Sequence, residues 1–99
     1  MNEKQQQLDI NLTDEIAQGV YSNLAIITHS NTEFIVDFVA MMPGIPKANV
    51  RSRVIMTPQN AKRFLNAFAD NVRKFEEKNG SIKETTIEIP MIDNNGALA

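Results

Sequence analysis

The first half of the chain has the hydrophobic patterning of β-strands. Apolar and polar residues alternate between 8 and 12, and β-branched and aromatic residues concentrate between Ile16 and Thr28. Glu33–Met42 alternates most regularly, and Asn49–Met56 alternates again after a break at 43–47 that holds two prolines and a glycine. These patterns predict an antiparallel β-meander of three to four strands.

Three segments complete this outline. Residues 29–32 form a polar break that predicts a hairpin loop between two strands. Apolar residues at a spacing of four leave a helix as the competing interpretation of Asp14–Leu24, although Gly19 weakens the helix and a strand is preferred. Isoleucines between Ile82 and Ile92 alternate weakly, which could add an edge strand.

The turn at 43–47 also predicts how its two flanking strands pair. A loop centred on Ile45 places three pairs opposite one another: Phe34 with Met56, Val36 with Val54, and Asp37 with Arg53. Apolar side chains then meet on one face of the sheet and opposite charges meet on the other. A slip by one residue would place valines opposite arginines, so the pattern favours this register.

The strongest signal along the chain is a helix from Pro58 to Asn79. Thr57 is a good N-cap, proline suits the first helical position, and Gly80 suits the C-terminal end. The helix carries one apolar stripe: Ala61, Phe64, Leu65, Phe68, Val72 and Phe75. Its length of about 33 Å matches that of a nine-residue strand, so we expect the stripe to pack on the sheet face of Phe34, Val36 and Phe38.

The expected fold is therefore a single α+β domain over residues 1–99. It consists of an antiparallel three- to four-stranded meander followed by one long C-terminal helix packed on one sheet face, with a core at 8–92 and disordered ends at 1–7 and 93–99. The second face of the sheet is expected to be an oligomer interface, because it would gather four apolar side chains: Ile27, Ile35, Val39 and Ile55. A homodimer is favoured, and a different protein partner stays open. The alternative is that Ile82–Ile92 folds back over this face.

Charge is distributed unevenly along the 99 residues, whose formal net charge is −2. Residues 1–46 carry a net charge of −5, residues 47–74 carry +6, and residues 75–99 carry −3. Such a basic segment is compatible with binding of single-stranded nucleic acid. The candidate residues are Arg51, Arg53, Lys62, Arg63, Arg73 and Lys74. Ion pairing of these cations with neighbouring acids is the favoured interpretation, because the core claims five of the six aromatic residues.

Signals for catalysis and cofactors are weak. His29 is the sole histidine and there is no cysteine, so the usual Cys/His zinc sites are excluded. Neither Ser22 nor Ser30, the serines near His29, lies in a nucleophile-elbow motif. We expect a non-enzymatic protein with no cofactor and no metal. The chain shows no apolar span or secretory signal, so we expect a cytoplasmic protein that does not bind membranes.

A set of short motifs resembles one known family. The motifs are Asn23, the strand at 33–38, Pro43-Gly44, residues 51–54, Pro58 with Ala61-Lys62, and the helix end at Glu76–Gly80. Over Ile16 to Ile82 the chain is similar to a bacterial family catalogued as domain of unknown function thirty-four sixty-seven. That resemblance implies no catalytic or binding residues. The order of strands followed by one helix also resembles the subunits of dimeric single-stranded nucleic-acid binders, an analogy at the level of fold.

Overall fold

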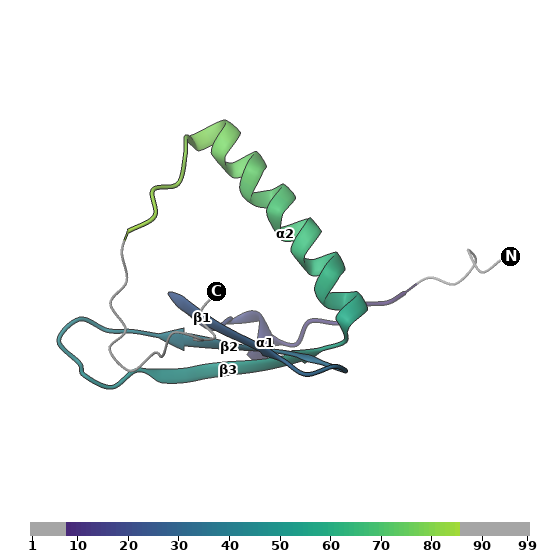
Figure 1. Cartoon of the computed structure of the whole chain (residues 1–99), viewed down its shortest axis with the longest axis horizontal. Helices are drawn as coiled ribbons and strands as arrows, with labels where there is room; N and C mark the ends of the chain where they lie inside the picture. The colour runs from purple at the N-terminus through teal and green to yellow at the C-terminus, as the bar shows by residue number, and fades with distance from the viewer. Residues whose placement is uncertain (1–7, 86–99) are drawn as a thin grey trace, which may run out of the picture.

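The computed structural model describes residues 8–85, which contain three strands and two helices (Figure 1). In chain order these are α1 (Asp14–Ala17), β1 (Leu24–His29), β2 (Phe34–Ala40), β3 (Asn49–Met56) and α2 (Pro58–Asn79). The expected α+β order of an antiparallel sheet followed by a long helix is confirmed.

The N-terminal part of the prediction is wrong. Residues 8–13 form no strand, and the strand expected over 16–28 begins only at Leu24. A single helical turn, α1, occupies Asp14–Ala17, where the Thr13 hydroxyl accepts a hydrogen bond from the backbone N–H of Ile16. Gly19 follows with φ of +78°, a conformation that favours glycine and ends the turn.

The sheet has the order β1-β2-β3, and both strand pairs are antiparallel. The register between β2 and β3 is the predicted one, with Asp37 opposite Arg53. It shifts by one residue at Phe38/Val39, which marks a bulge toward the open end of the sheet. Residues 81–85 have no regular structure, and residues 1–7 and 86–99, which include most of the possible edge strand, lie outside the described range.

Asn23 extends the pairing of β1 and β2 beyond Leu24, the first residue of β1. Its backbone N–H donates to the carbonyl oxygen of Val39, its side-chain nitrogen donates to the carbonyl oxygen of Met41 over 2.9 Å, and its side-chain oxygen accepts from the Met41 N–H over 2.8 Å. The amide thus takes the place of a strand backbone and secures the segment where β2 ends.

Helix α2 begins and ends where the sequence predicts. The Thr57 hydroxyl accepts a hydrogen bond from the N–H of Asn60 at 3.1 Å, and Pro58 occupies the first turn. At the other end, Gly80 has φ of +92° and donates its N–H to the Glu76 carbonyl at 2.8 Å. Capping at both ends accounts for the close match between the predicted and observed boundaries.

The direction of α2 is set by its short connection to the sheet. Thr57 alone separates β3 from α2, and its backbone is extended (φ −68°, ψ 156°), as a residue before proline prefers. Figure 1 shows α2 rising away from the sheet, so that the two enclose an open angle. Consequently Phe64, Phe68 and Phe75 are 46%, 59% and 53% exposed.

The interior of the described region is small. Only Leu24, Val36 and Val39 among its hydrophobic residues are buried. No helix within residues 8–85 is long and apolar enough to cross a membrane.

Candidate interaction groove

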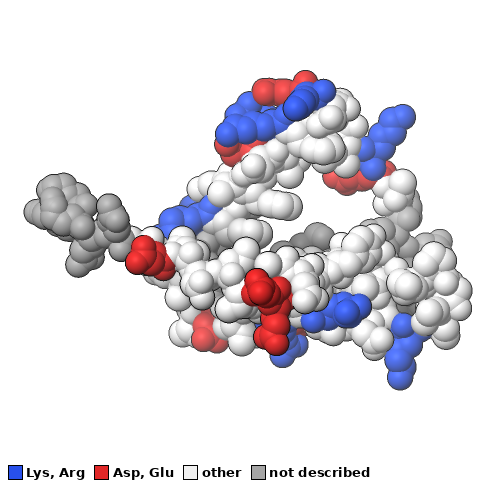
Figure 2. All heavy atoms as spheres, turned by 180° about the vertical axis from the view of Figure 1, so that it is seen from behind, with Lys and Arg blue, Asp and Glu red and all other residues white. Residues whose placement is uncertain are grey.

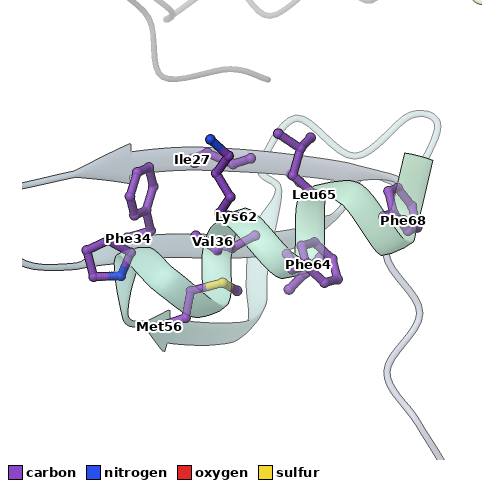
Figure 3. Close-up of a pocket in the computed structure, with 12 residues that line it drawn as sticks. Ile27, Phe34, Val36, Met56, Lys62, Phe64, Leu65 and Phe68 are labelled. Atoms are coloured by element: carbon purple, nitrogen blue, oxygen red, sulfur yellow. The ribbon is translucent and has the colours of Figure 1, made fainter. Parts of the chain in front are cut away.

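A groove of about 790 Å³ lies between α2 and the sheet face that α2 overhangs (Figure 3). Its sheet wall comes from β1 and β2: Ala25, Ile27, Phe34, Val36 and Phe38. These residues share one face because side chains alternate along a strand, and Ile27 stands directly opposite Val36. The wall is thus a continuous apolar surface.

The helix wall comes from the first three turns of α2: Ala61, Lys62, Phe64, Leu65 and Phe68. The rings of Phe64 and Phe68 stack with their centroids 5.5 Å apart. Met56 and Pro58 also line the groove where the chain passes from β3 to α2, and α2 diverges from the sheet beyond this point (Figure 1). We call this feature the α2 groove.

The α2 groove is almost free of polar groups. Among the described residues that line it, Lys62 is the only charged one. His29, at the end of β1, stacks on Phe34 with ring centroids 5.3 Å apart. An open apolar groove of this kind is suited to bind another apolar surface.

The opposite face of the sheet, here called the reverse face, carries the predicted ion pair. Two nitrogens of Arg53, Nε and Nη2, donate to the two carboxylate oxygens of Asp37 at 2.7 and 2.9 Å. The Asp37 side chain is 14% exposed and that of Arg53 is 60% exposed. The hydrogen bond from Arg53 lowers the pKa of Asp37, and the same bond raises the pKa of Arg53. Arg53 is therefore a structural partner of Asp37.

Two more of the cations predicted to bind nucleic acid form ion pairs along α2. Arg73 contacts Asp70 and Glu77, both at 2.7 Å, and Lys74 contacts Asp70 at 3.2 Å. The hydrogen bond from Arg73 is the main reason that the pKa of Asp70 is lowered, and the pKa of Arg73 is raised in return. Figure 2 shows acidic and basic groups intermixed along the helix.

The other three candidate nucleic-acid-binding residues, Arg51, Lys62 and Arg63, form no cluster with the rest. Arg51 is the unpaired residue at the bulge in β3, between Ser52 opposite Phe38 and Val50 opposite Val39, whereas Lys62 lines the groove. Within residues 8–85, no acid forms an ion pair with Arg51, Lys62 or Arg63. The six candidate nucleic-acid residues thus do not gather on one face of the molecule.

One of the four residues predicted to share the second sheet face was placed wrongly. Ile27 lies in the wall of the α2 groove, and its neighbour Ile26, opposite Asp37, occupies the reverse face instead. The sequence alone allowed this error because the position where β1 begins was not known, and a shift of one residue exchanges the two faces. Ile35 and Ile55 pair on the reverse face, where Ile55 is 57% exposed. Val39 is 4% exposed and is already covered within the chain.

The serines near His29 engage the backbone. The Ser22 hydroxyl donates to the carbonyl oxygens of Leu24 and Val39, and the Ser30 hydroxyl accepts from the N–H groups of Thr32 and Glu33. Ser30 thus stabilises the predicted hairpin loop. In residues 8–85 no group of three or more histidines and acids is placed to hold a metal ion.

Sequence comparison assigns the family. The model of the family described as Protein of unknown function (DUF3467) matches residues 1–84. The chain belongs to this family. Neither a curated protein nor a solved structure matches it. The DUF3467 assignment confirms the family resemblance predicted from the sequence motifs. The description of the family names no activity.

The α2 groove itself was not anticipated from the sequence, which predicted a helix packed against the sheet. The signal for it was present in the connection Met56-Thr57-Pro58. A single extended residue between a strand and a helix leaves the helix no loop in which to turn back onto the sheet. In this DUF3467 protein, the same connection leaves two apolar surfaces facing each other across an opening.

Proposed function

We propose that the protein is a non-enzymatic interaction module that acts as a homodimer, in which the apolar surfaces of two copies cover one another. The observation that carries this proposal is the contrast between a small interior and an open apolar groove. Only three hydrophobic residues of the described region are buried, while three phenylalanines of α2 stay about half exposed. A soluble chain rarely leaves a patch of this size uncovered.

The energetics favour a partner over an isolated chain. A phenylalanine buries roughly 150–250 Å² when fully packed, and apolar burial contributes about 25 cal/mol per Å². A half-exposed phenylalanine therefore gains only about half of the free energy that full burial of its ring would contribute. A second copy is the simplest partner, because it carries the same complementary surfaces at equal concentration and twofold dimers are the commonest closed assemblies.

The dimer also accommodates the finer features predicted from the sequence. In it, the stripe of α2 is packed on a sheet face, as its length and spacing favour. Leu8, Ile10 and Leu12, which are 84%, 83% and 65% exposed, alternate as a strand does and are available to extend the assembled sheet. A cytoplasmic location and the absence of a cofactor belong to the same proposal.

The test is the dependence of stability on protein concentration. Unfolding of one dimer releases two separate chains, so the urea midpoint of a dimer rises with chain concentration, whereas that of a monomer does not. We expect the midpoint, followed by circular dichroism, to rise over a hundredfold range of concentration. An unchanged midpoint over that range would contradict self-association.

Binding of single-stranded nucleic acid is the second candidate, supported by the cations that form no ion pair with a described residue, Arg51, Lys62 and Arg63. It requires binding of a labelled oligonucleotide that weakens steeply with salt and that the Arg51→Ala/Arg53→Ala double variant abolishes. Absence of binding at 50 mM salt would dismiss it. The pairing of Arg53 with Asp37 makes it the weaker candidate.

A further inference from the structure

The apolar stripe of α2 continues beyond the groove that it lines. The last stripe residue in the groove wall is Phe68, yet the stripe extends through Val72 to Phe75. Seven residues of helix add about 10 Å at 1.5 Å per residue. Phe75 is 53% exposed, and α2 rises away from the sheet in this direction (Figure 1). The distal part of the stripe therefore needs a surface that its own sheet does not supply.

The opposite side of α2 excludes one mode of association. That side carries the ion pairs of Arg73 with Asp70 and Glu77 and of Lys74 with Asp70. If α2 of a second copy were inserted bodily between sheet and helix, these charged groups would be buried against apolar side chains, which is costly. The partner must contact the stripe and leave the charged side in water.

We propose that two copies close their α2 grooves mouth to mouth, so that the distal stripe of each α2 docks on the mouth end of the other copy's sheet. This inference rests on the proposed self-association and specifies its geometry. A twofold axis between the mouths lets both sheet faces and both stripes line one common core. All charged sides then face solvent, and Phe75 of one copy lies near Ala25 and Phe38 of the other.

Two features of the chain support this arrangement. Met56 and Pro58 line the groove where the chain passes from β3 to α2, and α2 diverges from the sheet beyond them, so the widest approach for a partner is from the mouth (Figure 1). The angle between sheet and helix is held by the extended Thr57 before Pro58 and by the helix cap. The open shape is thus built into the single chain, and a second copy can dock with little rearrangement.

Disulfide trapping tests the geometry, because the natural chain has no cysteine. One variant carries Ala25→Cys and a second, with an affinity tag to change its mass, carries Val72→Cys. The two are co-expressed and oxidised. We expect a covalent heterodimer on a denaturing gel, since these positions approach one another across the two copies. Lys74→Cys, on the charged side of α2, replaces Val72→Cys in the matched control and is expected to give no such band.

The double variant Ala25→Cys/Val72→Cys separates the rival occupants of the groove. If α2 folded down onto its own sheet, this variant would form a disulfide within one chain and the mixed pair would form none, which would overturn the proposal. The mixed pair would also fail if the chain's own residues 86–99 filled the groove. A concentration-dependent urea midpoint without the heterodimer band would leave self-association standing and refute the mouth-to-mouth geometry. A urea midpoint that does not change with protein concentration would refute both self-association and the mouth-to-mouth geometry.

A second variant does not depend on a disulfide. Phe75 is not among the residues that line the single chain's groove, so Phe75→Glu should leave the helical circular dichroism signal intact. In the proposed dimer this position faces the common core, so we expect dissociation to monomers at concentrations where the natural chain is dimeric. A Phe75→Glu protein that dimerises as well as the natural chain would contradict the geometry.

Discussion

Replacing Phe68 by alanine tests the role of the α2 stripe quantitatively. Phe68 is 59% exposed in the single chain and stacks on Phe64 in the helix wall of the groove. If a second copy covers that exposed part, about 120 Å² of a ring that buries about 200 Å² is removed from water on dimerisation. At 25 cal/mol per Å², this contributes about 3 kcal/mol per copy.

The expected loss is smaller than this upper value, because alanine keeps a β-carbon and a dimer need not cover the ring completely. About 2 kcal/mol per copy, or about 4 kcal/mol per dimer, corresponds to about a thousandfold increase in the dissociation constant. Sedimentation equilibrium of the natural chain and of Phe68→Ala gives both constants directly.

Tyr21→Ala is the matched control, since Tyr21 is 69% exposed and lies outside the groove. Its dissociation constant should stay within about threefold of the natural value, as for a surface substitution. If Phe68→Ala also stayed within that range while remaining folded, the stripe would play no part in association. A large effect of Tyr21→Ala would instead place the interface elsewhere.

The remaining predictions concern the stability of the single chain. The pKa of Asp37 is lowered by its hydrogen bond from Arg53, so its contribution is present above the unfolded pKa of about 4 and is lost as pH falls through the lower folded value. Asp37→Asn should therefore flatten the decline of the urea midpoint below pH 4, and an equally steep decline would refute the linkage. Thr57→Ala removes the N-cap of α2 and should cost about 1 kcal/mol in urea unfolding; no loss would show that the cap is dispensable. Asn23→Ala removes two hydrogen bonds to Met41 and should cost about 1–3 kcal/mol, with a neutral result arguing that water replaces them.

The β2–β3 hairpin and α2 could be predicted because local rules define them. The prolines and glycine of the turn, together with apolar alternation, restrict the register, and only one register places Asp37 beside Arg53. Thr57 and Gly80 bound α2 by capping that is independent of tertiary contacts. Each of these features is encoded within a few residues, so the structure and the sequence agree.

The N-terminal segment and the groove could not be predicted in the same way. β-Branched residues between Ile16 and Thr28 favour a strand, but pairing with β2 begins only at Leu24 and is extended on its N-terminal side by Asn23. The angle between α2 and the sheet depends on the backbone conformation of one residue, Thr57. The periodicity of hydrophobic residues carries no information about that conformation. Ile27 was assigned to the wrong face for a related reason, since faces follow from where a strand starts.

The mass of the natural chain in solution tests the central claim most directly. One chain has a mass of 11.1 kDa, and sedimentation velocity at tens of micromolar separates one chain from two. We predict a single species of about 22 kDa, twice the mass of one chain. A compact, folded species of 11.1 kDa at that concentration would mean that no second copy covers the α2 groove, and the account of its function would be wrong.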